Sequence, residues 1–301
     1  MNNWRLNLEK LVSASQFSPS QLVNFRSSIR NEILESSEHI LTPNFDSLSS
    51  NDIQALMNIY DQRYFDCSCR KLIAQNEESL SFRVSTRMTS TGGKTTIEVV
   101  DEQVAGQHDA NRPPGNQAGN GRASNKKPQT QFSKFPKRKY EIAVSATLLF
   151  NSFESTKRPR KFAGRRSSRN SVLVAGVACA DRLDALLRIF EHELLHLIEF
   201  LLWNESSCSK SRFREIAGRL FGHRQSNHQL ITPTESAELK QGITVGDFVE
   251  FIHDGHKYFG YVNHISRRAT VLVPHKGGAR YTDGKRYAKF YVPLGHLKKG
   301  L

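Results

Sequence analysis

The stretch that decides the fold is FEHELLHLIEFLLW, residues 190–203. It is apolar nearly all round, and the pattern extends back to Asp181, so it predicts a helix over 181–203 that is buried on most sides. Asp181 is the expected N-cap of this helix. His192 and His196 are four positions apart, and residues with this spacing lie on the same face of a helix. The two imidazoles are therefore expected to point at one place.

The residues from 192 to 196 match the pattern H-E-x-x-H. A catalytic zinc ion needs three protein ligands and one open position, and His192 and His196 would supply two of the ligands. Glu193 would lie beside the ion, where its carboxylate can accept a proton from the attacking water. The alternative is a pair of core histidines with local hydrogen bonds. Burial favours the metal, because unpaired imidazoles and carboxylates are costly in a core.

The third ligand is not part of this pattern. The metzincin continuation, with a Gly and a further His later in the same helix, is absent. Three candidates remain: Cys208 in the loop after the helix, Glu215 in the next helical segment, and His223 at the far end of that segment. Without a third ligand the site would be inactive.

The chain has 301 residues and a formal net charge of +14. This charge favours polyanionic partners, of which nucleic acid is the commonest; solvated basic loops are the alternative. The first residues contain no apolar segment of signal-peptide length, and no run is long enough to span a membrane. The 4 cysteines form no C-x-x-C pair. We therefore expect a cytoplasmic protein with reduced thiols and no membrane contact, with a nuclear or nucleoid location as the alternative.

Changes in the hydrophobic pattern along the sequence divide the chain into three parts. Residues 1–49 are predicted to form a helical region, and residues 50–235 an α+β domain that contains the motif helix. From residue 241 to 301, short alternating segments predict five strands with a turn at Asp283-Gly284. Five short strands in so small a domain suggest a closed barrel.

Within the middle part, alternating residues predict a strand at 81–89 and a hairpin turn at Gly92-Gly93. A further strand and a short helix are predicted over 139–150. The segment 102–138 is rich in Gly, Pro, Asn and Lys and predicts a disordered basic insertion. A second basic stretch at 154–170 is predicted to be a loop.

Several segments together resemble the SprT-like zinc metalloproteases, the family that includes Spartan. The resemblance covers residues 50 to 230 and is carried by IYDQRYF, SFRVSTRMTSTGGKTT, YEIAVSATLL and DRLDALLRIFEHELLHLIEFLL. It implies a zincin-like fold, in which helices pack on a small antiparallel sheet, and zinc-dependent hydrolysis of peptide bonds.

The chain departs from the family's pattern at the third histidine, where the segment SKSRF places Ser209. A hydroxyl is a poor zinc ligand, whereas the thiolate of the neighbouring Cys208 is a good one. We therefore predict a Zn²⁺ ion bound by His192, His196 and Cys208, with Glu193 as the catalytic base.

Residues 241–301 resemble an SH3-like barrel of the Tudor or KOW kind, through VGDFVEFIHDGHKYFGYVNHISRRATVLV. The resemblance implies a binding module for nucleic acid or a protein tail. Lys and Arg outnumber Asp and Glu there, and interleaved aromatic residues suit base stacking beside phosphate contacts. The alternative is a basic barrel whose aromatic side chains all lie in the core. These aromatic residues are Tyr258, Phe259, Tyr281, Tyr287, Phe290 and Tyr291.

Together, these features predict an enzyme, a zinc-dependent metalloendopeptidase that acts on nucleic-acid-associated proteins. The substrate class rests on charge and on the resemblance. One alternative is a nucleic-acid-binding protein with an inactive protease domain, which Ser209 supports. Another is a zinc hydrolase for small substrates. The expected cofactor is Zn²⁺, and the expected partners are a protein or peptide substrate and nucleic acid.

Overall fold

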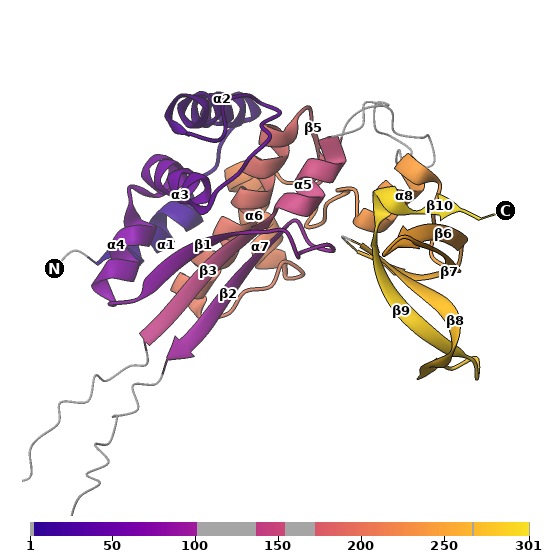
Figure 1. Cartoon of the computed structure of the whole chain (residues 1–301). Helices are drawn as coiled ribbons and strands as arrows, with labels where there is room; N and C mark the ends of the chain where they lie inside the picture. The colour runs from indigo at the N-terminus through magenta and orange to yellow at the C-terminus, as the bar shows by residue number, and fades with distance from the viewer. Residues whose placement is uncertain (1–2, 101–136, 154–171, 267, 301) are drawn as a thin grey trace, which may run out of the picture.

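The computed structural model describes residues 3–100, 137–153, 172–266 and 268–300 (Figure 1). Its helices and small sheets confirm the mixed α+β class. The helices are α1 (Trp4–Ala14), α2 (Pro19–Ser36), α3 (Ser50–Phe65), α4 (Ser68–Gln75), α5 (Ala146–Phe153), α6 (Arg182–Trp203), α7 (Ser211–Phe221) and α8 (Pro233–Gln241). The strands are β1 (Ser79–Ser85), β2 (Gly93–Val100), β3 (Lys137–Ser145), β4 (Val172–Val174), β5 (Val177–Cys179), β6 (Phe248–His253), β7 (His256–Ile265), β8 (Arg268–Arg280), β9 (Arg286–Pro293) and β10 (Lys298–Lys299).

The first sheet has the strand order β1-β3-β2. β3 lies in the centre, parallel to β1 and antiparallel to β2. The small antiparallel sheet expected from the resemblance is therefore wrong: the sheet is mixed, because β1 and β3 run in the same direction. The predicted hairpin at Gly92-Gly93 is therefore wrong, because β3 lies between the two strands that a tight turn would have paired. Instead, the segment after Ser85 passes the end of β3, where the Ser145 N–H donates to the Gly92 carbonyl at 2.8 Å. This arrangement leaves β2 at one edge of the sheet.

Most of the predicted basic insertion, and the second basic stretch at 154–170, lie outside the described residues. Lys137 and Arg138, the last residues assigned to the insertion, instead begin β3. They pair with Val100 and Val99 of β2. The strand starts there because β2 is long enough to offer backbone partners to both residues.

α6 is the central helix of the N-terminal part. Its N-cap is Asp181, as predicted, and the Asp181 carboxylate accepts the Asp184 N–H at 3.0 Å. α6 packs against β2, β3, α5 and α7 (Figure 1). The same apolar core includes Leu8 of α1 and Ile29 of α2, so the helices before residue 50 pack on this part of the molecule. Neither α6 nor any other described helix is long and apolar enough to cross a membrane.

The C-terminal residues have an apolar core of their own, covered by a second sheet of order β10-β6-β7-β8-β9. The predicted turn at Asp283-Gly284 joins β8 to β9, and Gly284 adopts a φ of +79° there. The predicted closed barrel is wrong: in the described part of the chain, β9 and β10 are not paired and the sheet stays open. β10 has only 2 residues, and both pair with β6.

Candidate metal centre

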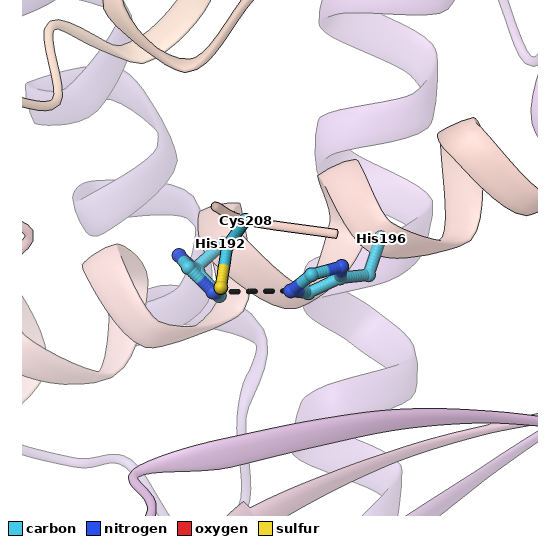
Figure 2. Close-up of side chains that lie close together, drawn as sticks. All are labelled: His192, His196 and Cys208. Carbon is cyan, nitrogen blue, oxygen red and sulfur yellow. Dashed lines mark hydrogen bonds between the residues drawn. The ribbon is translucent and has the colours of Figure 1, made fainter. Parts of the chain in front are cut away.

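The two histidines of α6 and Cys208 from the following loop form one cluster (Figure 2). The Nε2 atoms of His192 and His196 are 3.2 Å apart, and the cluster's three ligand atoms lie within 4.8 Å of one another. Two imidazole nitrogens on one tetrahedral zinc ion would be about 3.4 Å apart. The cluster could therefore hold a metal ion.

The chain returns to the histidines because α6 ends sharply. Asn204 adopts the left-handed conformation, with a φ of 59°, and turns the loop back along the last turns of the helix. α7 then begins, and its buried Phe213 packs against both imidazoles, with ring centroids 4.8 Å from His192 and 4.6 Å from His196. The histidines are thus held between the loop that carries Cys208 and the first turn of α7.

Burial keeps both imidazoles neutral. It lowers the pKa of His192 to about 3, and the nearby imidazole of His196 lowers it further because two adjacent rings cannot easily both take up a proton. Burial also lowers the pKa of His196, against the opposing effect of Glu199. A neutral imidazole is the form that binds a metal ion, so at neutral pH the pair is ready to do so.

A chain of hydrogen bonds fixes the orientation of His196. Its Nδ1 lies 2.6 Å from the Ser206 hydroxyl, and this hydroxyl donates to the carboxylate of Glu199 at 2.7 Å. Because Ser206 uses its proton on Glu199, its oxygen accepts the Nδ1 proton of His196. The lone pair of Nε2 is then directed at the cluster. Glu199 is fully buried and is held by the Ser207 N–H (3.2 Å) and by the Arg212 guanidinium (2.8 Å).

Glu193 lies beside the cluster, under strand β2. The Thr95 hydroxyl of β2 is 2.8 Å from Glu193 Oε2 and 2.9 Å from the Glu193 carbonyl oxygen. Burial raises the pKa of Glu193 to about 7, although the bonds with Thr95 act in the opposite direction. A carboxyl group with such a pKa is well suited to exchange protons near neutral pH. A Cβ atom on Gly93 would lie 2.6 Å from Glu193, so glycine is needed for β2 to pass this closely.

The cluster opens into a cleft of about 510 Å³. His192, Glu193, His196 and Cys208 share its surface with the start of β2 and with the segment 226–228. The start of β2 and the segment 226–228 form two walls of the cleft. The Gly92 N–H donates to His228 Nε2 at 2.9 Å and so joins these walls. Sequence reasoning missed His228, Thr95 and Ser206 as parts of the site. Thr95 and His228 reach the site through contacts between distant segments, and Ser206 reaches it through the conformation of the loop after α6. No local sequence pattern reports either.

His223 does not reach the cluster, although the sequence allowed it as a ligand. Its Nε2 is bonded to the buried carboxylate of Glu191 at 2.8 Å, and Tyr60 and Arg188 contact the same carboxylate at 2.9 and 3.3 Å. Burial alone would raise the pKa of Glu191, but Arg188, His223 and Arg26 lower it to about 2. His223 is therefore part of a buried ion-pair network around Glu191, away from the cluster.

Glu215 and Ser209 also lie outside the cluster. Glu215 is exposed on α7 and does not line the cleft. The Ser209 hydroxyl lies 2.8 Å from the hydroxyl of Ser207. Among the described residues, His192, His196 and Cys208 are the group of three side chains placed to share one ion. The structure thus brings together the three residues predicted as ligands.

Comparison with known proteins gives no relative. No protein-family model, no curated protein and no solved structure matches the chain.

Proposed function

We propose that the chain is a zinc-dependent peptidase with a zincin-like catalytic part. The observation that carries the proposal is the cluster of His192, His196 and Cys208 beside a buried carboxylate, Glu193, in an open cleft. Two imidazoles and a thiolate form a donor set that zinc prefers, and three protein ligands leave one position open.

Zinc bound there would supply a Lewis acid that polarises a carbonyl and acidifies water. Glu193 performs the proton transfers in this scheme. Its carboxylate takes a proton from the water that attacks the peptide carbonyl and passes it to the leaving amine. Thr95 orients this carboxylate through its contact with Oε2. Ser206 and Glu199 keep His196 in the tautomer that a metal ion requires.

β2 offers a place for the substrate. Among the described strands it lies at an edge of its sheet, and its first residues, from Gly93 to Thr95, line the cleft. The free edge of a strand presents unpaired N–H and C=O groups, and an extended peptide can add to them as a further strand. A peptide bound in this way would place a backbone carbonyl over the cluster, so the geometry favours peptides over small compact substrates.

The proposal includes a SprT-like family assignment, and an SH3-like relationship for the C-terminal part although its sheet is open. Nucleic-acid-associated proteins are the proposed substrate class, because the chain carries a net charge of +14. The second candidate is a nucleic-acid-binding protein with an inactive protease domain, favoured by Ser209 where the family has a histidine. The nearness of Cys208 to the two histidines favours the first candidate.

Zinc content and casein cleavage test the proposal together. We expect the full chain to bind one zinc ion and to cleave casein. Glu193→Gln should keep the zinc and lose about 100-fold to 10,000-fold in activity, because only the proton transfer is removed. Cys208→Ala should lose both zinc and activity.

Ser209→Ala is the matched control, since it changes the next residue in the same loop. It should retain both zinc and activity. A wild-type chain without stoichiometric zinc would contradict the proposal. Zinc binding with no cleavage above that of Glu193→Gln would favour the second candidate, the inactive protease domain.

A further inference from the structure

The outer face of the C-terminal sheet carries a row of exposed aromatic side chains. Phe248, Phe259 and Tyr261 are 37%, 44% and 47% exposed. Phe248 and Tyr261 are opposite each other on β6 and β7, with ring centroids 5.1 Å apart. Phe248 and Phe259 are nearly parallel, with centroids 6.1 Å apart and an interplanar angle of 10°. These three residues are called the aromatic row. Contiguous exposed apolar surface of this kind indicates a binding site.

A groove continues the aromatic row across the sheet. It has a volume of about 500 Å³ and is lined by Tyr261, Leu272, Tyr281 and Tyr287 among others. Tyr281 and Tyr287 meet edge to face, with centroids 5.5 Å apart. The Tyr287 hydroxyl donates to Asp283 at 2.7 Å, which fixes this wall of the groove. A flat ring of about the size of a nucleobase can therefore find aromatic surface in the groove as well as on the row.

Lysines surround the aromatic row. The Lys257 ammonium lies 5.5 Å from the centroid of Phe259. Lys298 is opposite Glu250 on the neighbouring strand, between the positions of the row. Lys289 is opposite Leu272, which is itself opposite Tyr261. Both Lys289 and Lys298 are exposed.

The acidic groups near the row and the groove already have partners. Glu250 pairs with Lys257 at 2.8 Å, and Asp247 pairs with Lys299 at 3.1 Å. Asp283 accepts the Tyr287 hydroxyl and the Lys285 N–H. Lys and Arg outnumber Asp and Glu over residues 241–301. The face therefore combines aromatic rings with an excess of positive charge.

We infer that this face binds single-stranded nucleic acid. Unpaired bases stack on the aromatic row and enter the groove, while Lys289 and Lys298 contact the phosphates. Aromatic rings flanked by cations are the chemistry that such strands require. A duplex cannot use the rings, because its bases are already stacked on one another. The inference does not depend on peptidase activity, since none of these residues belongs to the metal cluster.

Fluorescence anisotropy with labelled oligonucleotides tests the inference on the full chain. The probes are oligo(dT) and oligo(rU) of about 15 nucleotides, and a DNA duplex of the same length. The wild type should bind a single strand more tightly than the duplex. The two single-stranded probes show whether DNA or RNA is preferred.

The test variant is the double substitution Phe248→Leu and Phe259→Leu, which removes the rings but keeps apolar side chains. It should weaken single-strand binding by about tenfold or more, because each base loses a stacking surface, and should leave duplex binding unchanged. Leu41→Ala, an exposed apolar residue of the N-terminal part, is the control and should change neither.

Equal affinity of the wild type for single strand and duplex would overturn the inference, because the phosphates alone would then be recognised. The inference would also fail if the double variant kept the wild-type preference for single strands. His196→Ala separates the two proposals. Without zinc it should still bind oligo(dT) like the wild type, and the double variant should still bind zinc.

Discussion

The cleft on α6 and the outer face of the C-terminal sheet are built in opposite ways. In the cleft Glu193 is buried, the two histidines are half-buried, and hydrogen bonds hold these side chains: Thr95 holds Glu193, and Glu199 holds His196 through Ser206. On the C-terminal face the rings of Phe248 and Tyr261 are exposed to solvent and lie on the surface of the sheet.

The difference shows what each region is suited to do. Catalysis needs reacting groups held within a fraction of an ångström, since small displacements cost large factors in rate. Stacking on bases tolerates variation in the position of the rings, because every base offers a flat face. Substitutions in the cleft should therefore have large and specific effects, whereas single substitutions on the C-terminal face should have small and graded ones.

Among substitutions outside the metal-ligand set and Glu193 itself, Gly93→Ala should produce the largest effect. The added Cβ would lie 2.6 Å from the Cγ of Glu193 and would displace the carboxylate. We expect peptidase activity to fall about 100-fold while zinc content stays unchanged. Casein cleavage and zinc analysis measure both. Gly295→Ala, where a Cβ meets nothing within 4 Å, is the control. Wild-type activity in Gly93→Ala would show that Glu193 is not held as described.

Glu199→Gln should weaken zinc binding by about 10- to 100-fold, as expected for a residue that orients a metal ligand. The amide offers one acceptor oxygen where the carboxylate offers two, and both Ser206 and Arg212 donate to it. Competition with a chromophoric chelator measures the affinity. Glu205→Gln, an exposed carboxylate in the same loop, should leave the affinity unchanged. Equal zinc affinities of Glu199→Gln and Glu205→Gln would argue against the view that the hydrogen bonds from Glu199 through Ser206 orient His196.

Tyr60→Phe should lower the free energy of unfolding by about 2 kcal/mol, because a buried hydrogen bond to a charged carboxylate is lost. The Tyr60 hydroxyl donates to Glu191 at 2.9 Å inside the core. Urea denaturation measures the change. Tyr291→Phe, at a side chain that is 63% exposed, should have no measurable effect. If both variants unfolded alike, the buried network would contribute little to stability.

Lys289→Gln should have the smallest effect. We expect the dependence of oligo(dT) affinity on salt to decrease by about 0.7 log-log units, the value for one phosphate contact on a single strand. The melting temperature should not change. Anisotropy titrations at several salt concentrations measure the slope. Lys10→Gln, on the exposed surface of α1, should leave the slope unchanged. An unchanged slope in Lys289→Gln would remove this lysine from the phosphate contacts.

The sequence predicted the cluster of His192, His196 and Cys208, because its main parts are local. Periodicity placed α6, Asp181 capped it, and the spacing of His192 and His196 put both rings on one face. Cys208 was predicted from the chemistry of its thiol. The strand order β1-β3-β2 was not predicted, since pairing across an insertion depends on distant segments. The contact of Thr95 with Glu193 follows from that order and was missed with it.

The C-terminal part shows a second limit of structure prediction from the sequence. Its strands and the Asp283-Gly284 turn were predicted, but not which aromatic residues face outward. Tyr258 and Phe290 pack against the core, whereas Phe259 and Tyr261 are exposed. Successive residues of a strand point to opposite faces, but aromatic residues occupy both sets of alternating positions on β7, Tyr258 in one set and Phe259 and Tyr261 in the other. The sequence pattern therefore does not show which set faces the core.

Zinc K-edge X-ray absorption on the zinc-loaded full chain tests the central claim most directly. We predict one sulfur neighbour at about 2.3 Å and two imidazole nitrogens at about 2.0–2.1 Å. Cys208→Ser should remove the sulfur, and Ser209→Ala should leave the spectrum unchanged. A zinc environment without sulfur in the wild type, or a chain that takes up no stoichiometric zinc, would contradict the account.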